Sequence, residues 1–211
     1  VEAPIKENLA AGIIKLSGWE PGQAFLDPMC GSGTFLIEAA LIATNQAPGL
    51  KRNFGFMAWK NFDKALFKDI KKSYQNAIIQ KDFLRIYGSD KDLRAVRVSK
   101  KNLVLAGFEN CIQLACKQFN EIKPPLDEGV LVTNPPYGER IGDDEDLDNA
   151  YPDWARTLKQ SFAGWSTYFL TNDFRMPKLM RLAPSKKTPL FNGALDCRLF
   201  EIKMVAGSNR K

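Results

Sequence analysis

The chain has 211 residues, 45% of them apolar, which is enough to bury the core of one domain. Thirty basic and 24 acidic residues give a net charge of +6, which permits a polyanionic partner without requiring one. The chain contains no histidine, so an imidazole base, a Ser-His-Asp triad and a histidine-ligated metal site are excluded.

The charge is unevenly distributed along the chain. Residues 51–101 carry 14 basic and five acidic side chains, and residues 152–211 carry 11 and four. Residues 121–148 carry two and nine, so two basic segments flank an acidic one.

The four cysteines form no CxxC pair and indicate no disulfide framework, so we expect a reduced, cytoplasmic setting. No signal peptide and no apolar run of 18 residues is present, so the sequence supports neither secretion nor a membrane span. Because the chain starts at Val1 rather than at methionine, we expect a fragment of a longer protein.

The first part of the chain predicts a helix, a strand and a second helix. Apolar residues recur at helical spacing over residues 4–17, and Gly18 and Pro21-Gly22 then turn the chain. Residues 24–26 form an apolar run typical of a buried strand, and residues 35–43 predict a helix.

The segment between this strand and helix, Asp27-Pro28-Met29-Cys30-Gly31-Ser32-Gly33-Thr34, predicts a nucleotide-type cradle. Gly31 and Gly33 have no Cβ to block a ligand, and the first N–H groups of the helix are unsatisfied donors. Leu36 stands where the dinucleotide fingerprint needs a third glycine, and the lysine of a phosphate loop is missing. Asp27 would repel a phosphate but suits an ammonium or sulfonium group. A glycine-rich turn without a ligand remains an alternative.

Residues 46–60 combine proline, glycine and basic residues with aromatic ones, which is typical of a loop. Phe56, Met57 and Trp59 either offer a surface for base stacking or anchor the loop to the core, and both interpretations stay open. Residues 63–81 predict a lysine-rich helix, whose charges taken singly are explained by a solvated face.

Residues 84–90 predict the second strand, which ends in Asp90. At this place in a doubly wound sheet, a carboxylate accepts hydrogen bonds from the ribose hydroxyls of a nucleoside. Asp90 lies 63 residues beyond Asp27, far more than the roughly 20 of the compact dinucleotide unit, so the intervening basic helix is an insertion. A helix over residues 92–106 follows, and Gly107 ends it.

The rest of the chain continues the alternation of strands and helices. The order predicts an α/β fold with a mostly parallel central sheet, helices on both faces and an antiparallel C-terminal hairpin. The further elements expected are strands at 111–116, 130–133 and 166–171, a mobile acidic loop at 143–148, a helix at 150–163 and a hairpin around Phe191-Asn192-Gly193.

The segment Asn134-Pro135-Pro136-Tyr137 follows the strand at 130–133, and the strand order places it beside the glycine loop. Neither proline has an N–H, so the backbone offers only rigid acceptors, to which the Asn134 side chain adds a carbonyl. Two convergent acceptors match the hydrogens of an amide or exocyclic amino group and favour the geometry in which its lone pair points outward, without base catalysis. Tyr137 offers a flat face for stacking. A proline-rich turn without function is the alternative.

Three motifs carry a family resemblance: Asp27 to Gly33, Gly88-Ser89-Asp90, and Asn134 to Tyr137. They resemble the cofactor, ribose and catalytic motifs of class I S-adenosylmethionine-dependent amino-methyltransferases, which have a Rossmann-like fold. The chain is most similar to the bacterial large-subunit ribosomal RNA guanine-N2 methyltransferases, formerly labelled N6-adenine-specific DNA methylases. In that family an N-terminal RNA-binding THUMP domain precedes the catalytic domain, and the resemblance to the catalytic domain covers nearly all of residues 1–211.

The resemblance implies a role for each matching residue. The glycine loop would hold the methionine end of S-adenosylmethionine, Asp90 the ribose, and Gln118 and Phe119 the adenine. Many relatives have Asp at position 118, and Gln only partly replaces its contact to the adenine amino group. The implied catalytic residues are Asn134, Pro135, Pro136 and Tyr137, no metal is implied, and the implied cofactor-binding residues are Asp27, Pro28, Cys30, Gly31, Ser32, Gly33, Thr34, Asp90, Lys91, Gln118, Phe119 and Asn134.

The resulting hypothesis is methyl transfer from S-adenosylmethionine to guanine N2 in ribosomal RNA, by direct displacement on a base flipped out of its stack. Ring-carbon methylation would need a cysteine beside the prolines, where Tyr137 stands. N6-adenine methylation of DNA or RNA and N5 methylation of a protein glutamine share the motif and remain alternatives, although the basic segments favour nucleic acid. A non-catalytic RNA-binding assembly domain is disfavoured, because the cofactor and catalytic motifs are both intact.

Overall fold

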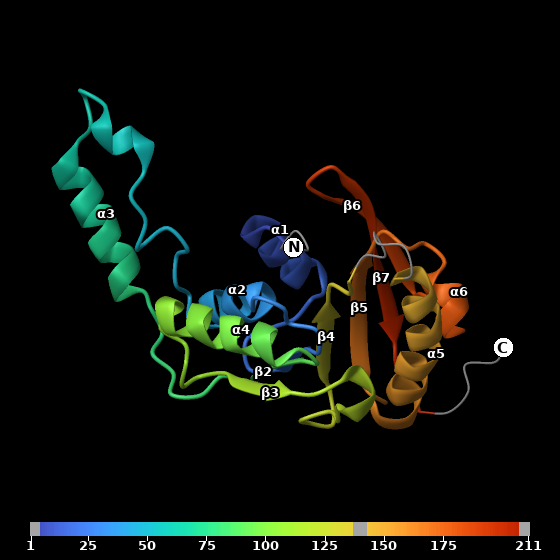
Figure 1. Ribbon diagram of the computed structural model, residues 1–211. Helices are drawn as coiled ribbons and strands as arrows, with labels where there is room; N and C mark the ends of the chain where they lie inside the picture. Colours follow the sequence, from blue (N-terminus) through green and yellow to red (C-terminus); the bar gives the residue numbers. More distant parts are fainter. Residues whose placement is uncertain (1–4, 137–142, 207–211) are drawn as a thin grey trace.

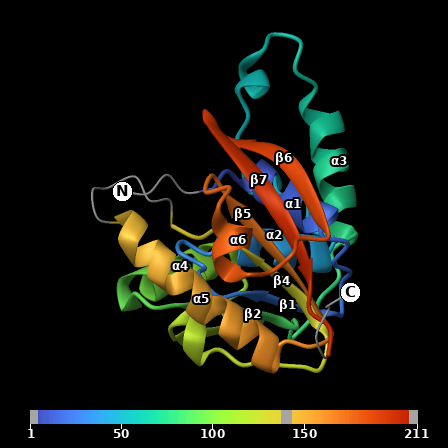
Figure 2. The ribbon, with the colours of Figure 1, turned by 90° about the vertical axis from the view of Figure 1, so that its right-hand side faces the viewer.

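The computed structural model describes residues 5–136 and 143–206 of the chain. The strands within these residues are β1 (Ala24–Asp27), β2 (Ile86–Asp90), β3 (Gln113–Cys116), β4 (Gly129–Thr133), β5 (Trp165–Thr171), β6 (Lys186–Asn192) and β7 (Leu195–Lys203). They form one sheet with the order β3-β2-β1-β4-β5-β7-β6 (Figure 1). Strands β1 to β5 run parallel to one another, and β7 runs antiparallel to both β5 and β6. β6 and β7 form a hairpin at the edge of the sheet (Figure 2).

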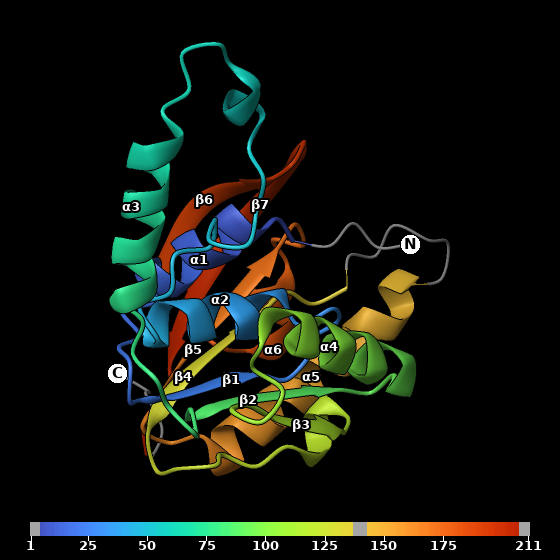
Figure 3. The ribbon, with the colours of Figure 1, turned by 90° about the vertical axis from the view of Figure 1, so that its left-hand side faces the viewer.

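Helices cover both faces of this sheet. The helices within the described residues are α1 (Glu7–Leu16), α2 (Thr34–Ala43), η1 (Gly55–Ala58), α3 (Lys64–Asn76), α4 (Leu93–Ala106), η2 (Phe119–Glu121), α5 (Asp143–Ser161) and α6 (Met176–Met180), where η marks a 3₁₀ turn. α1, α2 and α4 lie on one face, and α5 and α6 lie on the other (Figures 1 and 3). No helix in the described ranges is long and apolar enough to cross a membrane.

β1 and β4 are the central strands, and apolar side chains bury them on both faces. Along β4, Val130 and Val132 belong to the apolar cluster beneath α1 and α2, whereas Leu131 belongs to the cluster beneath α5. A parallel strand covered by helices on both sides has a continuous apolar sequence rather than an alternating one, which explains the run from Val130 to Val132.

Local signals at both ends of α4 explain where this helix begins and ends. The carboxylate of Asp92 accepts a hydrogen bond of 2.8 Å from the backbone N–H of Arg94, as an N-cap does. Gly107 has a φ of 87°, in the left-handed region that favours glycine, and it ends the helix. The predicted helix over residues 92–106 and its stop are confirmed.

The predicted fold class and alternation of elements are confirmed, with boundaries shifted by a few residues. The expected loop at residues 143–148 is wrong, because α5 already begins at Asp143. Its first turn is acidic in sequence, and negative charge at a helix N-terminus is favourable to the helix dipole. The short helix α6 was not anticipated.

The insertion between α2 and β2 projects from the body of the molecule as an arm of residues 46–78, which contains η1 and α3 (Figures 1 and 3). The chain closes at its base, where Ile79 N donates to Thr44 O at 2.8 Å and Asn45 Nδ2 donates to Ala77 O at 3.2 Å. No residue of η1 or α3 is buried, and neither apolar cluster contains a residue of the arm.

We expect Gly129→Ala to destabilise the protein. A Cβ at Gly129 would lie 2.7 Å from the Trp165 ring and 2.8 Å from the carbonyl oxygen of Ala24, where β4 packs against β1 and β5. The free energy of unfolding should fall by about 1–3 kcal/mol, as measured by urea denaturation. The control is Gly12→Ala in α1, where an added Cβ meets no atom within 4 Å and should raise the free energy of unfolding by about 0.5–1 kcal/mol. Equal losses at both glycines would contradict the steric argument.

Candidate active site

The carboxyl ends of β1 and β4 lie side by side, because the two strands are parallel neighbours with Leu26 opposite Leu131. β1 ends at Asp27 and β4 ends at Thr133. Thr133 Oγ1 donates a hydrogen bond of 2.9 Å to Asp27 Oδ1. The expected proximity of the glycine loop and the segment that begins at Asn134 is thereby confirmed.

Asp27 is a buried carboxylate, 2% exposed. Its two hydrogen bonds, from Thr133 Oγ1 and from Met29 N at 3.2 Å, both end on Oδ1, and no donor among the described residues reaches Oδ2. Burial raises the pKa of Asp27 to about 7, and the carboxylate of Asp90 acts in the same direction. A positive charge beside Oδ2 would stabilise the ionised form, so the site suits a cationic ligand.

The glycine loop after β1 is held in place by side chains of α4. Ser99 Oγ donates to Gly31 O at 2.7 Å, and Asn102 Nδ2 donates to Ser32 O at 2.9 Å. Gly31 and Gly33 have φ values of 51° and 84°, which favour glycine. A Cβ at Gly33 would lie 3.0 Å from Ser99 Oγ, whereas one at Gly31 would meet no atom within 4 Å. Gly31 therefore borders open space from which a ligand can approach the backbone.

Asp90 joins this loop to the end of β2. Its Oδ2 accepts a hydrogen bond of 3.0 Å from Gly31 N, and its Oδ1 accepts one of 2.9 Å from Asp92 N. Next to it, Cys30 N donates to Ser89 O at 2.9 Å. Each carboxylate oxygen has two lone pairs, so each keeps an acceptor position after these bonds. The side chain is thus oriented by the backbone and can still accept hydrogen bonds from a ligand.

The remaining loop residues of the implied cofactor set differ in exposure. Pro28 and Cys30 are buried, and burial raises the pKa of the Cys30 thiol to about 12, so it stays protonated at neutral pH. The hydroxyls of Ser32 and Thr34 are hydrogen-bonded to each other at 3.2 Å. Lys91 is exposed after the end of β2.

Gln118 and Phe119 follow β3. Gln118 is exposed, and its backbone N–H donates to Glu121 Oε2 at 2.9 Å. Phe119 is 5% exposed, and the centroid of its ring lies 5.2 Å from that of Trp154 and 6.3 Å from that of Phe169. The Phe119 ring therefore belongs to the core beneath α5, which leaves its backbone as the part that can meet a ligand.

The segment after β4 is described as far as Pro136. Asn134 and Pro136 are half-buried, and Pro135 is buried. Pro135 and Pro136 supply no N–H, so this part of the sheet's carboxyl edge presents acceptors, as the sequence predicts. Tyr137 lies outside the described residues.

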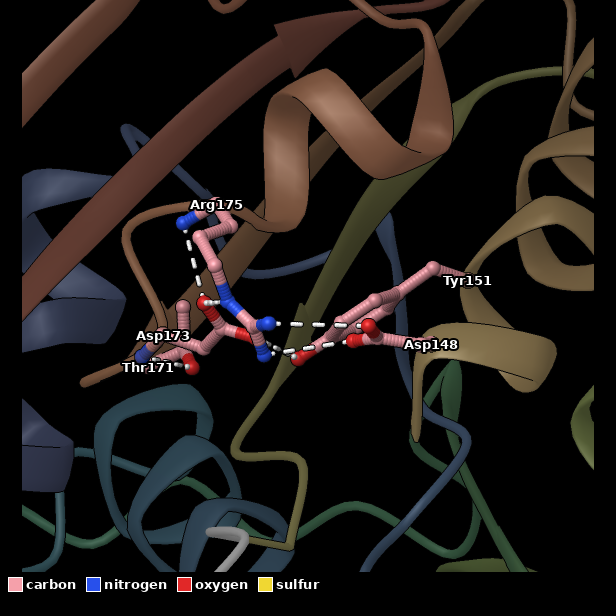
Figure 4. Close-up of polar contacts among 5 residues, drawn as sticks. All are labelled: Asp148, Tyr151, Thr171, Asp173 and Arg175. Carbon is pink, nitrogen blue, oxygen red and sulfur yellow. Dashed lines mark hydrogen bonds and ion pairs between the residues drawn. The ribbon is translucent and has the colours of Figure 1, made fainter. Parts of the chain in front are cut away.

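A polar network at the carboxyl end of β5, the other neighbour of β4, was missed by the sequence analysis (Figure 4). Arg175 Nε and Nη2 donate to the two carboxylate oxygens of Asp173 at 3.0 Å, and Nη2 also donates to Asp148 Oδ1 at 3.2 Å. The buried Tyr151 donates to Asp173 Oδ2 at 3.3 Å. Burial acts to raise the pKa of Asp173, but the bonds from Arg175 hold it below its usual value. The network ties α5 to the end of β5.

One local signal could have indicated this network. Asp173 comes shortly after the end of β5, just as Asp27 and Asp90 stand at the ends of β1 and β2. Its partner Tyr151 lies 22 positions away, and Asp148 lies 27 positions from Arg175, so no short motif joins them. Among the described residues, no group of three or more Cys, Asp or Glu side chains is placed to hold a metal ion.

Comparison with known proteins gives the family. Residues 1–201 match the model of the RMKL-like methyltransferase domain. The chain belongs to this family. It is 41% identical over 215 residues to the ribosomal RNA large subunit methyltransferase K/L of Shewanella sp. strain W3-18-1, an alignment that covers 100% of this chain and 30% of that protein. The chain thus spans less than a third of the length of the curated relatives that it matches.

Two solved structures are similar over almost the whole chain. SMU.472, solved in complex with SAH, has a TM-score of 0.91 and 39% identity, with 99% of this chain and 55% of that chain covered. A protein described as a predicted N6-adenine-specific DNA methylase from Listeria monocytogenes has a TM-score of 0.88 and 34% identity, with 97% and 52% covered. The resemblance to methyltransferases inferred from the motifs is confirmed.

The raised pKa of Asp27 predicts a stability that depends on pH. Because the folded-state pKa of about 7 lies above the ordinary value of 3.8, the folded protein binds this proton more tightly than the unfolded chain does. The contribution of Asp27 to the free energy of unfolding should therefore be largest below about pH 4 and should fall as the pH rises toward 7. Asp27→Asn should remove a large part of this slope, measured by urea denaturation across the pH range.

Glu38 provides the comparison, because burial also raises its pKa to about 7, with a smaller effect of Glu7. Glu38→Gln should remove a separate part of the slope. A pH dependence that Asp27→Asn leaves unchanged would show that Asp27 ionises as it does in the unfolded chain.

Proposed function

We propose that the chain transfers a methyl group from S-adenosylmethionine to the exocyclic N2 of guanine in large-subunit ribosomal RNA. The observation that carries this proposal is the hydrogen bond from Thr133 to Asp27, which holds the segment after β4 beside the glycine loop. The name of the Shewanella relative supports ribosomal RNA as the substrate, and the SAH bound to SMU.472 supports the cofactor.

The residues around the glycine loop fit S-adenosylmethionine. The carboxylate of Asp27 would face the positive methionine end, and the open side of Gly31 would let that end approach the backbone. Asp90 would accept the ribose hydroxyls, while Gln118 and the backbone of Phe119 would meet the adenine. When bound, this cofactor supplies an electrophilic methyl group on a sulfonium.

The segment after β4 would bind the amino group that accepts the methyl. The side-chain carbonyl of Asn134 and a backbone carbonyl of the rigid segment that ends at Pro136 would each accept a hydrogen bond from one N–H of this amino group. In this geometry the nitrogen lone pair, otherwise delocalised into the base, points outward. The stabilisation is electrostatic and needs no titratable base, which agrees with a chain that has no histidine. Tyr137 would stack on the base.

N6-adenine methylation is the second candidate, because the similar Listeria monocytogenes protein is described as N6-adenine-specific. Both bases present an exocyclic amino group with two hydrogens, so the four-residue motif serves either. N5 methylation of a protein glutamine uses the same chemistry, but the basic excess of residues 51–101 favours nucleic acid.

The proposal extends to domain organisation. Residues 1–211 act as the catalytic domain of a longer methyltransferase, in which an N-terminal THUMP domain also binds RNA. The match of residues 1–201 to a methyltransferase-domain family supports the first part, and the family resemblance supports the second.

The test of the reaction is incubation with labelled S-adenosylmethionine and unmodified large-subunit ribosomal RNA, followed by mass spectrometry of the nucleosides. N2-methylguanosine supports the proposal, and N6-methyladenosine selects the second candidate. Label in protein instead of RNA would point to glutamine methylation. Calorimetry that finds no S-adenosylmethionine binding would favour a non-catalytic assembly domain.

We expect Asn134→Ala to lower kcat about 10²–10³-fold, because the loss of one preorganised group at such a site has this effect. S-adenosylmethionine binding, measured by calorimetry, should weaken far less. Asn110→Ala, at an exposed position after α4, is the control and should keep the wild-type rate. An Asn134→Ala variant that binds cofactor and methylates within a few-fold of wild type would exclude the proposed grip on the amino group.

A further inference from the structure

The arm of residues 46–78 carries most of the net charge of the chain. It contains seven basic and two acidic residues, a net charge of +5 against +6 for the whole chain. Lys51 has a structural use, since its Nζ donates to Leu105 O and Ala106 O near the end of α4. Taken singly, the lysines of α3 are explained by a solvated face, so what matters is how they are arranged.

Three lysines of α3 form a row along one side of the helix. Lys64, Lys68 and Lys72 are spaced four residues apart, so they follow one another on the same face at a rise of about 6 Å per step. All three are exposed, and none forms an ion pair with any part of the chain that the structure describes. The row is a line of positive charge without an ion-pair partner among the described residues.

The aromatic residues of the arm do not anchor it to the core, which was one of the two interpretations left open by the sequence. The rings of Phe54 and Phe56 are stacked, with 5.2 Å between their centroids. The centroids of Phe62 and Phe67 lie 5.5 Å apart, and each lies 5.8 Å from that of Phe56. These four rings hold the arm itself together rather than anchoring it to the core. Trp59, whose centroid lies 6.4 Å from that of Phe56, stays 68% exposed at the edge of this cluster.

An exposed tryptophan and a row of exposed lysines on the same arm supply the two kinds of contact by which proteins bind single-stranded and looped RNA. Lysines neutralise phosphates and release their counterions, and an aromatic face stacks on a base of any sequence. A protruding element suits a large folded polyanion, because such a substrate extends well beyond the base that is methylated.

We propose that the arm is an RNA-docking surface, in which Lys64, Lys68 and Lys72 contact consecutive phosphates and Trp59 stacks on an unpaired base. This proposal rests on the proposed function, because it takes RNA as the substrate. The arm supplies affinity for the RNA and takes no part in the methyl transfer.

A second face of α3 is apolar and does not compete with this assignment. Leu66, Ile70 and Tyr74 are exposed and also spaced by four residues, but they are offset by two positions from the lysines. Two positions correspond to a rotation of about 200° around the helix axis, so the two rows face opposite ways. The RNA occupies the lysine side.

The first test replaces the row by alanine, Lys64→Ala, Lys68→Ala and Lys72→Ala together, in the full chain. The control removes the same charge from exposed lysines of the body, Lys15→Ala, Lys101→Ala and Lys123→Ala. Binding to unmodified large-subunit ribosomal RNA is measured by fluorescence anisotropy from 50 to 200 mM salt. The arm variant should bind at least about tenfold more weakly and lower the slope of log K against log salt by about 3, whereas the control should change little.

The second test concerns the tryptophan. Trp59→Ala should weaken RNA binding about tenfold, and Trp59→Phe should restore most of it, since a smaller aromatic ring still stacks. Phe191→Ala, which removes a ring 65% exposed at the tip of the β6–β7 hairpin, is the matched control and should bind like wild type.

Kinetics separate the arm from the proposed function. If both hold, the lysine variant raises the KM for RNA and leaves kcat within about twofold. A wild-type chain that binds the RNA but methylates no nucleoside contradicts the proposed function. The arm proposal is then still tested by comparing the slopes of log K against log salt for the arm and control variants. Equal slopes for the arm and control variants overturn the arm proposal even if methylation is intact. The arm proposal is also overturned if light scattering shows a dimer that covers the three lysines and that RNA does not dissociate. In that case the arm binds a second copy of the chain.

Discussion

The candidate site depends on one buried carboxylate at the point where β1 meets β4. A buried charge is costly unless hydrogen bonds or a cation compensate it, and here Thr133 and Met29 bond only to Oδ1 of Asp27. Asp90 adds a second negative charge nearby. The same bond from Thr133 that partly stabilises Asp27 also sets the position from which Asn134 leaves β4. One contact therefore joins the buried carboxylate at the end of β1 to the end of β4, where the segment that begins at Asn134 leaves the sheet.

The glycine loop has a defined shape because elements distant in sequence support it. Ser99 and Asn102 of α4 hold the carbonyls of Gly31 and Ser32, and Asp90 holds the N–H of Gly31. Since α4 begins and ends at strong capping residues, its side chains present fixed donors to the loop. A site held by side chains of rigid elements needs little reorganisation when a ligand binds, which is the condition for electrostatic preorganisation.

The sequence predicts those features that short segments determine. Strands, caps and the ends of strands at Asp27 and Asp90 have local signals, and these are confirmed. The features that it does not predict arise from contacts between distant segments. Nothing near Phe119 shows that its ring packs on Trp154, and nothing in residues 54–67 shows that the phenylalanines pack on each other instead of on the core. The start of α5 is acidic, and acidic residues are typical both of a solvated loop and of a helix N-terminus, where they interact favourably with the helix dipole. Composition alone therefore does not distinguish the two.

The arm is joined to the body at its base and through Lys51, which bonds to the end of α4, and it shares no apolar cluster with the strand ends. The arm closes on itself through the bonds of Thr44 and Asn45, and it contributes no residue to either apolar cluster. The entropic cost of closing a loop grows only slowly with its length, so an insertion of this length adds little to that cost. Substitutions that share no partners have additive effects, so charge can change along α3 without disturbing Asp27 or Thr133. If the proposed function holds, a fold with this division can adjust its affinity for RNA through the arm without changing the residues at the sheet's carboxyl edge.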